Sequence, residues 1–369
     1  MNKIILFGGA FDPIHLGHLK MAKRSLDFLN ADRLIFIPTN HSPFKGEEIR
    51  SDYRLEMVKA GVRNSDSRIE VSDYEAKSDK VSYTFDTVTY FKTLYPSKDY
   101  DLYFLIGSDQ EENLDKWYRI KELSGLVRFI CFSRPSYPLN TANMSAFRVG
   151  IIPDLEMDIS STDIRMGRKL DCPEGVIDYI VSEELYFMPF IKKNEKPRRF
   201  EHSKQVGKLA YKIAEANSLR PEKAYLAGLL HDITRMRSTP ADIRKADEEY
   251  SSFFPGGKIP SWCYHQFTAR MFLEREMGFE DAEILDAITY HTTGKKNMSP
   301  LGMILYAADK IEPTRGYDSS NLIRAMMDDY KEGFRIVLKA NRDFLYRLDK
   351  SKMVLDEFSS GCFNYYLKG

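Results

Sequence analysis

Hydrophobic positions in residues 1–190 follow a regular alternation. Short apolar runs, typical of buried strands, alternate with longer stretches in which apolar residues recur at helical spacing. The runs predict strands at residues 4–7, 34–37, 69–71, 102–106, 127–132 and 149–152. The stretches between them predict helices near residues 18–30, 51–63, 84–95 and 116–123. Alternating strands and helices indicate a doubly wound, Rossmann-like α/β fold, a parallel sheet that binds ligands at the carboxyl ends of its strands.

After residue 197 the strand pattern stops and helical spacing remains. Apolar residues recur three and four positions apart, for example at Val206, Leu209, Ala210 and Ile213. This spacing predicts an all-α bundle. The preceding residues 191–197 are mostly polar and include Pro197, so we expect a linker there. The chain is therefore expected to hold an α/β domain over residues 1–190 and an all-α domain over residues 198–369.

Composition and charge narrow the class of protein. Hydrophobic residues make up 43% and charged residues 29% of the chain, as is ordinary for a soluble globular protein. No apolar run reaches the length of about 18 residues that a membrane span needs, and the first residues show no signal-peptide pattern. Four cysteines lie far apart without CxxC spacing, which predicts isolated thiols in a reducing compartment, so we expect a cytoplasmic protein.

Charge is spread unevenly between the two halves. Residues 1–190 carry 24 basic against 29 acidic side chains, a net charge of −5, and residues 191–369 carry 30 against 25, a net charge of +5. Neither half is basic enough to predict a nucleic-acid partner. We therefore expect neither a nucleic acid nor a membrane as partner, and assembly into a homo-oligomer stays open.

Residues 8–18 read Gly-Gly-Ala-Phe-Asp-Pro-Ile-His-Leu-Gly-His and follow the first predicted strand. Two glycines at a strand end let the backbone approach a ligand closely. His15 and His18 fall at the start of the next predicted helix, where free N–H groups and the helix dipole attract phosphate. Two imidazoles at such a place suit a phosphate whose negative charge grows during a reaction. The pattern differs from GxGxxG, so it does not predict a dinucleotide held as a hydride carrier.

Further polar and aromatic residues follow the later strands. Lys45 lies in a loop with two prolines after the second strand, where a lysine offers a point charge to phosphate. Gly107 and Asp109 follow the fourth strand, and an acid at that place suits a ribose hydroxyl. The aromatic pair Trp117 and Tyr118 fits either a stacked ring or the hydrophobic core.

A second candidate anion site lies near the end of the α/β region. Ser160, Ser161 and Thr162 precede another predicted helix, a pattern that by itself indicates helix capping. With Arg165 added, the same N–H groups and a guanidinium suit a polyphosphate tail. Arg134 stands at the end of the fifth strand.

With these motifs in place, residues 1–188 resemble the bacterial nicotinate-nucleotide adenylyltransferases of the HxGH nucleotidyltransferase superfamily. The resemblance rests on the histidine motif, on Ser-Tyr-Thr-Phe-Asp-Thr at residues 82–87 and on Ile-Ser-Ser-Thr at residues 159–162. It implies transfer of AMP from ATP to nicotinate mononucleotide, giving deamido-NAD and pyrophosphate. Such a reaction needs positioning and charge stabilisation rather than a covalent nucleophile. Pantetheine-phosphate adenylyltransferase is the alternative, although its signature usually has Thr or Ser where His15 stands.

The same resemblance implies a role for each motif. His15 and His18 would stabilise the transition-state oxygens, and Mg²⁺ would bridge the ATP phosphates. The cationic residues expected on those phosphates are Lys45 and Arg165. The residues expected to hold the pyridine acid are Thr84, Trp117 and Tyr118. The other residues expected to contact a nucleotide are Gly8, Gly9, Phe11, Asp12, Gly107, Asp109, Arg134, Ser160, Ser161 and Thr162.

Six histidine and aspartate residues recur through the predicted bundle. They are His202, His231, Asp232, His265, His291 and Asp309. His231 and Asp232 directly follow the apolar residues 227–230, which predicts that both lie on an inner helix of the bundle. A single histidine on an apolar helix is usually structural, but six imidazoles and carboxylates in this order suit iron, manganese or zinc, and no cysteine competes for the metal.

The order of these residues resembles the HD phosphohydrolase superfamily, in particular its symmetrical diadenosine-tetraphosphate hydrolases. The resemblance implies one metal, iron or manganese, held by His202, His231, Asp232 and Asp309. It implies a second metal held by His265 and His291, with Asp232 as the catalytic bridge between the two. The residues expected on the polyphosphate are Arg199, Arg235 and Arg315. Two departures, Arg235 where Lys is frequent and Gln266 where Gly is frequent, leave the identity of the substrate open.

The whole chain is thus expected to be a bifunctional enzyme, an α/β adenylyltransferase domain followed by an all-α HD-type hydrolase domain. Its expected partners are ATP, nicotinate mononucleotide and diadenosine tetraphosphate. Two alternatives for the second half stay open: a regulatory module that senses an adenine nucleotide, and a phosphohydrolase for another nucleotide such as a guanosine alarmone. A complete set of six ligands favours hydrolysis, because a sensor need not keep an open metal site.

Overall fold

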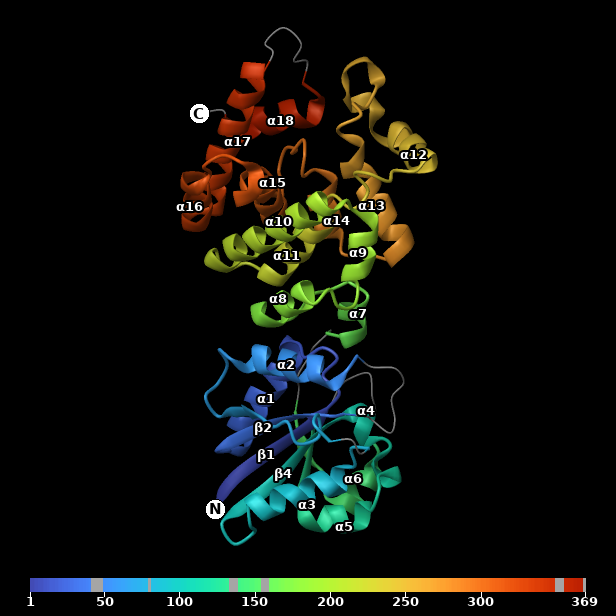
Figure 1. Cartoon of the computed structure of the whole chain (residues 1–369), viewed down its shortest axis with the longest axis vertical. Helices are drawn as coiled ribbons and strands as arrows, with labels where there is room; N and C mark the ends of the chain where they lie inside the picture. The colour runs from blue at the N-terminus through green and yellow to red at the C-terminus, as the bar shows by residue number, and fades with distance from the viewer. Residues whose placement is uncertain (41–48, 79–80, 133–138, 154–158, 349–354, 368–369) are drawn as a thin grey trace. The chain divides into compact units, whose positions relative to one another are not determined.

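A computed structural model describes residues 1–40, 49–78, 81–132, 139–153, 159–348 and 355–367, with the backbone alone for Asp109 and Leu348. The chain divides into two compact units (Figure 1). The first unit comprises Met1–Thr162 and Asp171–Tyr179, and the second comprises Asp163–Leu170 and Ile180–Gly369.

The first unit is built around a six-stranded parallel sheet. In spatial order its strands are β3 (Ile69–Val71), β2 (Arg33–Pro38), β1 (Asn2–Gly9), β4 (Tyr100–Gly107), β5 (Arg128–Phe132) and β6 (Gly150–Ile152). All neighbouring pairs are parallel. The strand order reverses between β1 and β4, and open sheets of this kind bind ligands in the crevice at that point. The expected doubly wound fold is confirmed, with all six expected strands present.

Helices cover both faces of this sheet (Figure 1). On one face lie α1 (Leu16–Leu29) and α2 (Ser51–Val62), and on the other lie α3 (Thr84–Leu94), α5 (Ile120–Leu126) and α6 (Thr141–Phe147). Side chains alternate along the strands, so Ile4 and Leu6 of β1 share a core with α3 and α5. Two short helices, α4 (Ser108–Glu111) and the 3₁₀ helix η1 (Leu114–Lys116), follow β4. The helix expected over residues 116–123 begins only at Ile120, because Trp117 is extended and Arg119 has a positive φ of 52°.

The described part of the second unit is helical throughout, as expected. Along the chain, the division between the two units falls within α7 (Ser161–Arg165) and again within α8 (Glu174–Ser182). The helices that follow are α9 (Met188–Asn194), α10 (Pro197–Ala216), α11 (Pro221–Leu230), α12 (Pro240–Tyr250), α13 (Tyr264–Met277), α14 (Ala282–Thr289), α15 (Pro300–Ile311), α16 (Ser320–Asp328), α17 (Tyr330–Leu348) and α18 (Glu357–Tyr366). Short 3₁₀ helices η2 (Ser251–Phe253), η3 (Pro255–Gly257) and η4 (Pro313–Arg315) lie between them.

The segment expected to be a linker, residues 191–197, is mostly helical. Helix α9 extends to Asn194, and α10 begins at Pro197, a residue that fits the first turn of a helix because it needs no N–H partner there. Ile191 is fully buried, so the segment packs as part of the second unit rather than connecting two units loosely.

Close packing of α10 and α11 brings ligand residues together. A Cβ atom on Gly228 would lie 2.5 Å from the Cα atom of Gly207, so only glycine allows these helices to approach this closely. The rings of His202 on α10 and His231 just after α11 lie 5.3 Å apart, and α15 packs against both helices. None of the helices in the described part of the chain has the length and hydrophobicity that crossing a bilayer requires.

Two candidate active sites

The turn after β1 carries both histidines of the first motif. His15 is buried and precedes α1, and His18 lies in the first turn of that helix. Their rings stack at a centroid distance of 3.7 Å, and the backbone N–H of His15 donates to Nδ1 of His18 over 3.2 Å. Because this Nδ1 accepts, the proton of a neutral His18 ring sits on Nε2, in a form that can be donated to a phosphate oxygen.

Arg54, which the sequence did not single out, fixes the backbone of this turn. Its side chain on α2 is 1% exposed. The guanidinium donates to the carbonyl oxygens of Ala10 over 2.7 Å, Asn40 over 2.8 Å and Ile49 over 2.9 Å. These bonds connect α2 to the segments that follow β1 and β2, at the sheet edge where a ligand is expected.

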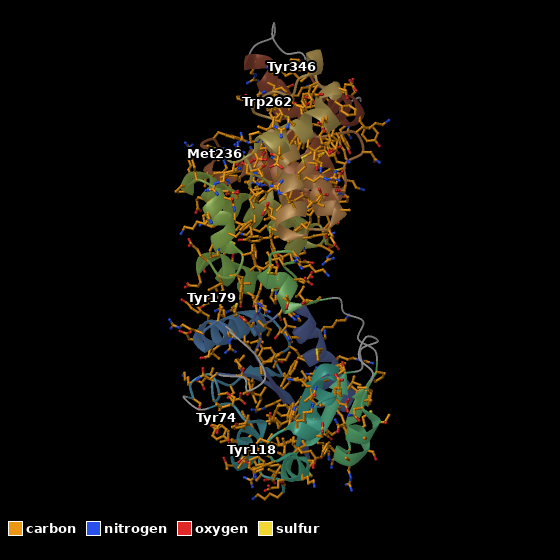
Figure 2. The ribbon with its side chains drawn as sticks, turned by 90° about the vertical axis from the view of Figure 1, so that its right-hand side faces the viewer. Tyr74, Tyr118, Tyr179, Met236, Trp262 and Tyr346 are labelled. Carbon is orange, nitrogen blue, oxygen red and sulfur yellow. The ribbon has the colours of Figure 1, made fainter. Side chains whose placement is uncertain are left out.

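A pocket of about 350 Å³ lies at the same sheet edge. Its lining includes Gly8 and Gly9 together with Thr84, Trp117 and Tyr118, so the structure brings the residues expected to hold the pyridine acid next to the turn. Trp117 also packs edge-on against core aromatic rings at 6.1 Å, which shows that it serves both core and pocket. Tyr118 is 50% exposed and lies at the surface of the first unit (Figure 2).

The polar groups of this pocket favour an acidic ligand. Lys116 contributes a cation to the lining, and Thr84 is the first residue of α3, where the helix dipole is positive. Glu75, also in the lining, is 6% exposed, and its Oε2 atom has no hydrogen-bond partner among the described residues. Burial raises the pKa of Glu75, although hydrogen bonds from Thr87 and Ser82 act in the opposite direction. Lys116 and the start of α3 are therefore the features of the lining that favour a carboxylate.

Other predicted residues of the first site lie around the turn. Phe11 adopts a positive φ of 48° and places its ring 5.1 Å from that of His18, and Asp12 is buried. The Ser161 hydroxyl donates to the carbonyl oxygen of Pro13 over 3.3 Å, which joins this residue to the turn.

The remaining predicted residues of the first site lie near the ends of helices and strands or outside the described residues. The backbone N–H of Thr162 donates to the Ser160 hydroxyl over 3.2 Å, a capping contact. Gly107 ends β4. Asp109 lies in α4 with only its backbone described, and Arg165 belongs to the second unit. Lys45 and Arg134 lie outside the described residues.

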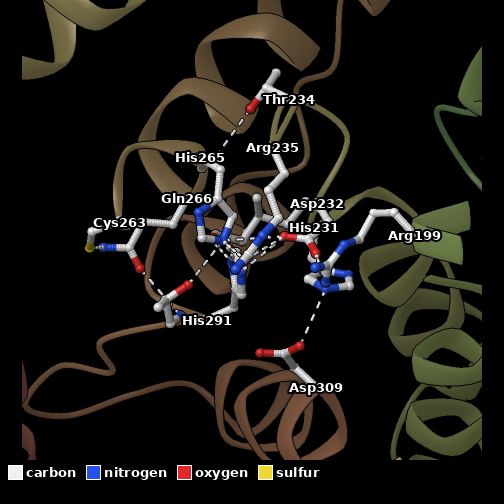
Figure 3. Close-up of polar contacts among 12 residues, drawn as sticks. Arg199, His231, Asp232, Thr234, Arg235, Cys263, His265, Gln266, His291 and Asp309 are labelled. Carbon is white, nitrogen blue, oxygen red and sulfur yellow. Dashed lines mark hydrogen bonds and ion pairs between the residues drawn. The ribbon is translucent and has the colours of Figure 1, made fainter. Parts of the chain in front are cut away.

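The second candidate site gathers all six predicted ligand residues of the second unit. Figure 3 labels His231, Asp232, His265, His291 and Asp309. Helices carry three of them: His202 on α10, His265 on α13 and Asp309 on α15. Turns after helices carry the other three: His231 and Asp232 after α11, and His291 after α14. The prediction that His231 and Asp232 lie on an inner helix is thus corrected, because α11 ends at Leu230. Five of the six are buried, and the side chain of Asp309 is 14% exposed.

One set of donor atoms surrounds Oδ1 of Asp232. This oxygen lies 3.2 Å from Nε2 of His265 and 3.8 Å from Nε2 of His291, and the two nitrogens lie 3.1 Å apart. Neighbouring ligand atoms on one metal, at bond lengths of about 2.0–2.2 Å, are separated by about 3.0–3.5 Å. Two of the three separations lie in this range and the third is slightly longer, so the three atoms are close enough to share one metal ion.

A second set lies on the other oxygen of the same carboxylate. Nε2 of His231 is 3.6 Å from Oδ2 of Asp232 and 3.5 Å from Oδ1 of Asp309. Nε2 of His202 is 3.1 Å from that Asp309 oxygen. His231, Asp232 and His291 also place donor atoms within 4.8 Å of one another, so the two sets are adjacent. The arrangement could hold two ions with Asp232 between them.

Hydrogen bonds on the outer nitrogens orient three of the imidazoles. Nδ1 of His231 and Nδ1 of His291 each bond to the backbone carbonyl three residues earlier, over 2.7 Å. Nδ1 of His202 bonds to Oε1 of the buried Glu312 over 2.9 Å. A proton on each Nδ1 leaves the Nε2 lone pair directed into the cluster, as in metal-binding histidines. Nε2 of His231 has no hydrogen-bond partner among the described residues, which fits an atom whose partner is a metal.

Burial and charge give this cluster the protonation states of a metal site. Burial lowers the pKa of His265 to about 4 and that of His291 well below its usual range. Burial alone would raise the pKa of Asp232, but the surrounding imidazoles and Arg235 outweigh it and lower this pKa. At neutral pH these ligands are thus neutral imidazoles beside an ionised carboxylate, the forms that bind metals. Burial acts to lower the pKa of His231 as well, but the carboxylates of Asp232 and Asp309 outweigh burial and raise this pKa. The two carboxylates therefore favour positive charge beside His231.

All three arginines predicted for polyphosphate contact the carboxylates of the cluster. Nη1 of Arg199 lies 2.7 Å from Oδ2 of Asp232, and Nη1 of Arg235 lies 3.3 Å from Oδ1. Arg315 pairs with Asp309. The arginine side chains are between 28% and 36% exposed, so they reach from the buried cluster to solvent.

Comparison with known proteins agrees with the two sites. Residues 6–167 match the Cytidylyltransferase-like family, and residues 199–314 match the HD domain family. The chain is 34% identical over 348 residues to a Mycoplasma genitalium protein named "Probable nicotinate-nucleotide adenylyltransferase/Ap4A hydrolase", aligning 92% of this chain with 97% of that protein. The chain belongs to the nicotinate-nucleotide adenylyltransferase/Ap4A hydrolase family.

Other relatives match the whole chain or its first half. A Mycoplasma pneumoniae protein of the same adenylyltransferase/Ap4A hydrolase name is 32% identical over 91% of this chain and 98% of its own length. An Aliarcobacter butzleri protein named "Probable nicotinate-nucleotide adenylyltransferase" is 42% identical over 44% of this chain and 86% of its own length. Membership of the adenylyltransferase/Ap4A hydrolase family confirms that the first half is a nucleotidyltransferase domain and the second an HD-type hydrolase domain with a candidate site for divalent metal.

Proposed function

We propose that the first domain transfers AMP from ATP to nicotinate mononucleotide and releases pyrophosphate. The observation that carries this proposal is the placement of His15 and His18 at the start of α1, next to a pocket lined by Thr84 and Trp117. The names of the relatives support the same acceptor. Mg²⁺ would accompany ATP and offset the charge of its phosphates.

The residues of this site would act by positioning and by charge. The phosphate of the mononucleotide attacks the α-phosphorus of ATP in line, and the bond from that phosphorus to pyrophosphate breaks. Negative charge then grows on the oxygens around the phosphorus, where the two histidines and the start of α1 would stabilise it. Trp117 would stack on the pyridine ring, and Thr84 would hold its carboxylate at the start of α3. Lys45 and Arg165 are assigned to the ATP phosphates, and Asp109 to a ribose.

The test compares the acid with the amide as acceptor. We expect a higher kcat/KM for nicotinate mononucleotide than for nicotinamide mononucleotide, measured by pyrophosphate release. The Lys116→Met variant should narrow this preference, because the pocket loses a cation. Lys121→Met, which removes an exposed lysine of α5 outside the pocket lining, should leave the preference unchanged. A preference for the amide would overturn the acceptor assignment and leave the reaction type standing.

We also propose that the second domain hydrolyses diadenosine tetraphosphate to two ADP at a two-metal centre. The observation behind this proposal is that each carboxylate oxygen of Asp232 lies close to the histidine nitrogens of a different set of ligand atoms. The proposed ligands of one metal are His202, His231, Asp232 and Asp309, and those of the other are His265, His291 and Asp232. Iron and manganese suit this mixture of imidazole and carboxylate. When bound, such metals supply Lewis acidity, which activates water and neutralises phosphate charge.

The other residues of this domain would orient the ligands and the substrate. Glu312 holds the ring of His202, and Asp232 presents one oxygen to each set. Arg199, Arg235 and Arg315 combine contact with the cluster and exposure to solvent, so they are assigned to the phosphates that flank the reacting one. Cations on the flanking phosphates would place the central bridge of the tetraphosphate at the metals.

A nucleotide panel on the full chain, combined with metal analysis, tests this function against its alternatives. Turnover of diadenosine tetraphosphate by metal-containing protein supports it. Cleavage of a guanosine alarmone alone would assign another substrate, and tight binding of an adenine nucleotide without turnover would indicate a sensor. The Asp232→Ala variant should lose hydrolysis and keep adenylyl transfer, which serves as the internal control in the same molecule.

A further inference from the structure

Gln266 directly follows His265 on α13 and is fully buried. Its amide lies against the turn that follows α14 (Figure 3). Oε1 accepts the backbone N–H groups of Thr292 over 3.2 Å and Thr293 over 3.3 Å. Nε2 donates to the Thr293 hydroxyl over 3.3 Å and to the sulfur of Cys263 over 3.1 Å. Both ends of the amide are therefore satisfied, and neither bonds to a predicted metal ligand.

The turn that Gln266 holds is the one that carries His291. Thr292 and Thr293 follow this histidine directly, so the Gln266 amide links the backbone beside His265 to the backbone beside His291. From the other side, the ammonium group of Lys310 on α15 donates to the carbonyl oxygen of His291 over 2.9 Å. The turn is thus fixed from two helices, and the Nε2 atoms of the two histidines lie 3.1 Å apart.

We propose that Gln266 is a positioning residue that sets the separation of His265 and His291, and thereby the affinity of their half of the metal centre. The inference rests on the proposed two-metal site but does not depend on which nucleotide is cleaved. A glycine, which is frequent here in the superfamily that the chain resembles, has no side chain to make these bonds. The departure at position 266 thus concerns the geometry of the metal ligands rather than contact with a substrate.

Titration of the full chain with Mn²⁺ in the absence of nucleotide tests this role, with the free ion followed by electron paramagnetic resonance. Wild-type protein should bind two Mn²⁺ ions. Gln266→Met replaces the amide by an apolar side chain of similar length, and it should bind one ion as the wild type does and the other about 10–100-fold more weakly. Gln266→Glu keeps an acceptor for both backbone N–H groups and should recover most of the lost affinity.

Asn217→Leu is the matched control. Asn217 is also an amide that links separate elements: it donates to the carbonyl oxygens of Ile213 and Met326 and accepts the backbone N–H of Tyr330. Its loss should lower the temperature of thermal unfolding and leave both Mn²⁺ affinities unchanged. If Gln266→Met lacks a cooperative thermal transition, Gln266→Asn, one methylene shorter, provides the same comparison.

Three results would overturn the role of Gln266. They are wild-type Mn²⁺ binding by a folded Gln266→Met or Gln266→Asn variant, equal weakening of both ions, and the same selective loss in Asn217→Leu. Fewer than two ions on wild-type protein would overturn the two-metal proposal itself, and this inference with it, so the two failures are distinguishable.

Discussion

Glu195 makes the stability of the second unit dependent on pH. Its carboxyl group lies between α9 and α10 and is 7% exposed. The Ser203 hydroxyl donates to Oε1 over 3.1 Å, whereas Oε2 has no hydrogen-bond partner among the described residues. Burial raises the pKa of Glu195 to about 7; the nearby charge of His231 acts against this rise and that of Asp232 adds to it.

The direction of the pH effect follows from the two states of this carboxyl group. Its pKa is 4.5 in the absence of the fold and about 7 in the folded chain. Because the folded value is the higher one, the contribution of Glu195 to stability is fully present below pH 4.5 and is lost as the pH rises through about 7. The gap between the two values corresponds to about 3 kcal/mol in the free energy of unfolding.

The Glu195→Gln variant removes this ionisation and keeps the shape of the side chain. At pH 5 its free energy of unfolding should be close to that of the wild type. At pH 8 its free energy of unfolding should be higher than that of the wild type by about 2–3 kcal/mol. Urea unfolding of chelator-treated protein, followed by circular dichroism, measures the difference without bound metal. Glu201→Gln is the control, because Glu201 is exposed on α10. Its pKa is lowered, chiefly by the hydrogen bond from Lys204. A Glu195→Gln variant that differs from the wild type equally at both pH values, or is less stable at pH 8, would refute the reasoning.

Further predictions concern the first site and the domain boundary. His18→Ala should lower kcat for adenylyl transfer about 10²–10³-fold and leave hydrolysis intact, and ordinary transfer would contradict the role of His18. A fragment of residues 1–190 should retain adenylyl transfer, whereas an unfolded fragment would show that the two units share a core. Residues 184–369 should unfold at a higher temperature than residues 198–369, which lack α9 and Glu195; equal unfolding temperatures would contradict the placement of α9 in the second unit.

The sheet was predictable because its strands are apolar runs buried between two layers of helices. The local sequence pattern was less informative where one residue type occurs in two kinds of structure. Pro197 indicates a linker when read with its polar neighbours, but the structure uses it as the first residue of α10. The apolar run before His231 indicated a helix that continues through Asp232, whereas α11 ends at Leu230 and lets the imidazole bond back to a carbonyl of its last turn.

In both candidate sites, the residue types and spacing predicted side chains that the structure brings together, but they did not predict the side chains that orient them. Glu312 lies 110 positions after His202, and Arg54 lies 44 positions after Ala10, so no local period connects these partners. Gln266 was noticed only as a departure from a family pattern, and its partners in the turn after α14 become visible only in three dimensions. A sequence feature that could have pointed to Glu312 as a partner of the site is its position three residues after the predicted ligand Asp309.

The products of diadenosine tetraphosphate cleavage test the two-metal hydrolase most directly. Asp232 would hold one metal with each carboxylate oxygen, and the neighbouring arginines would bind the flanking phosphates, so we expect cleavage at the centre of the tetraphosphate. Chromatography of the reaction of full-length protein supplied with iron or manganese should therefore show ADP alone, and the Asp232→Ala variant should form no product. Equal amounts of AMP and ATP, or no cleavage by the metal-loaded protein, would contradict the proposal.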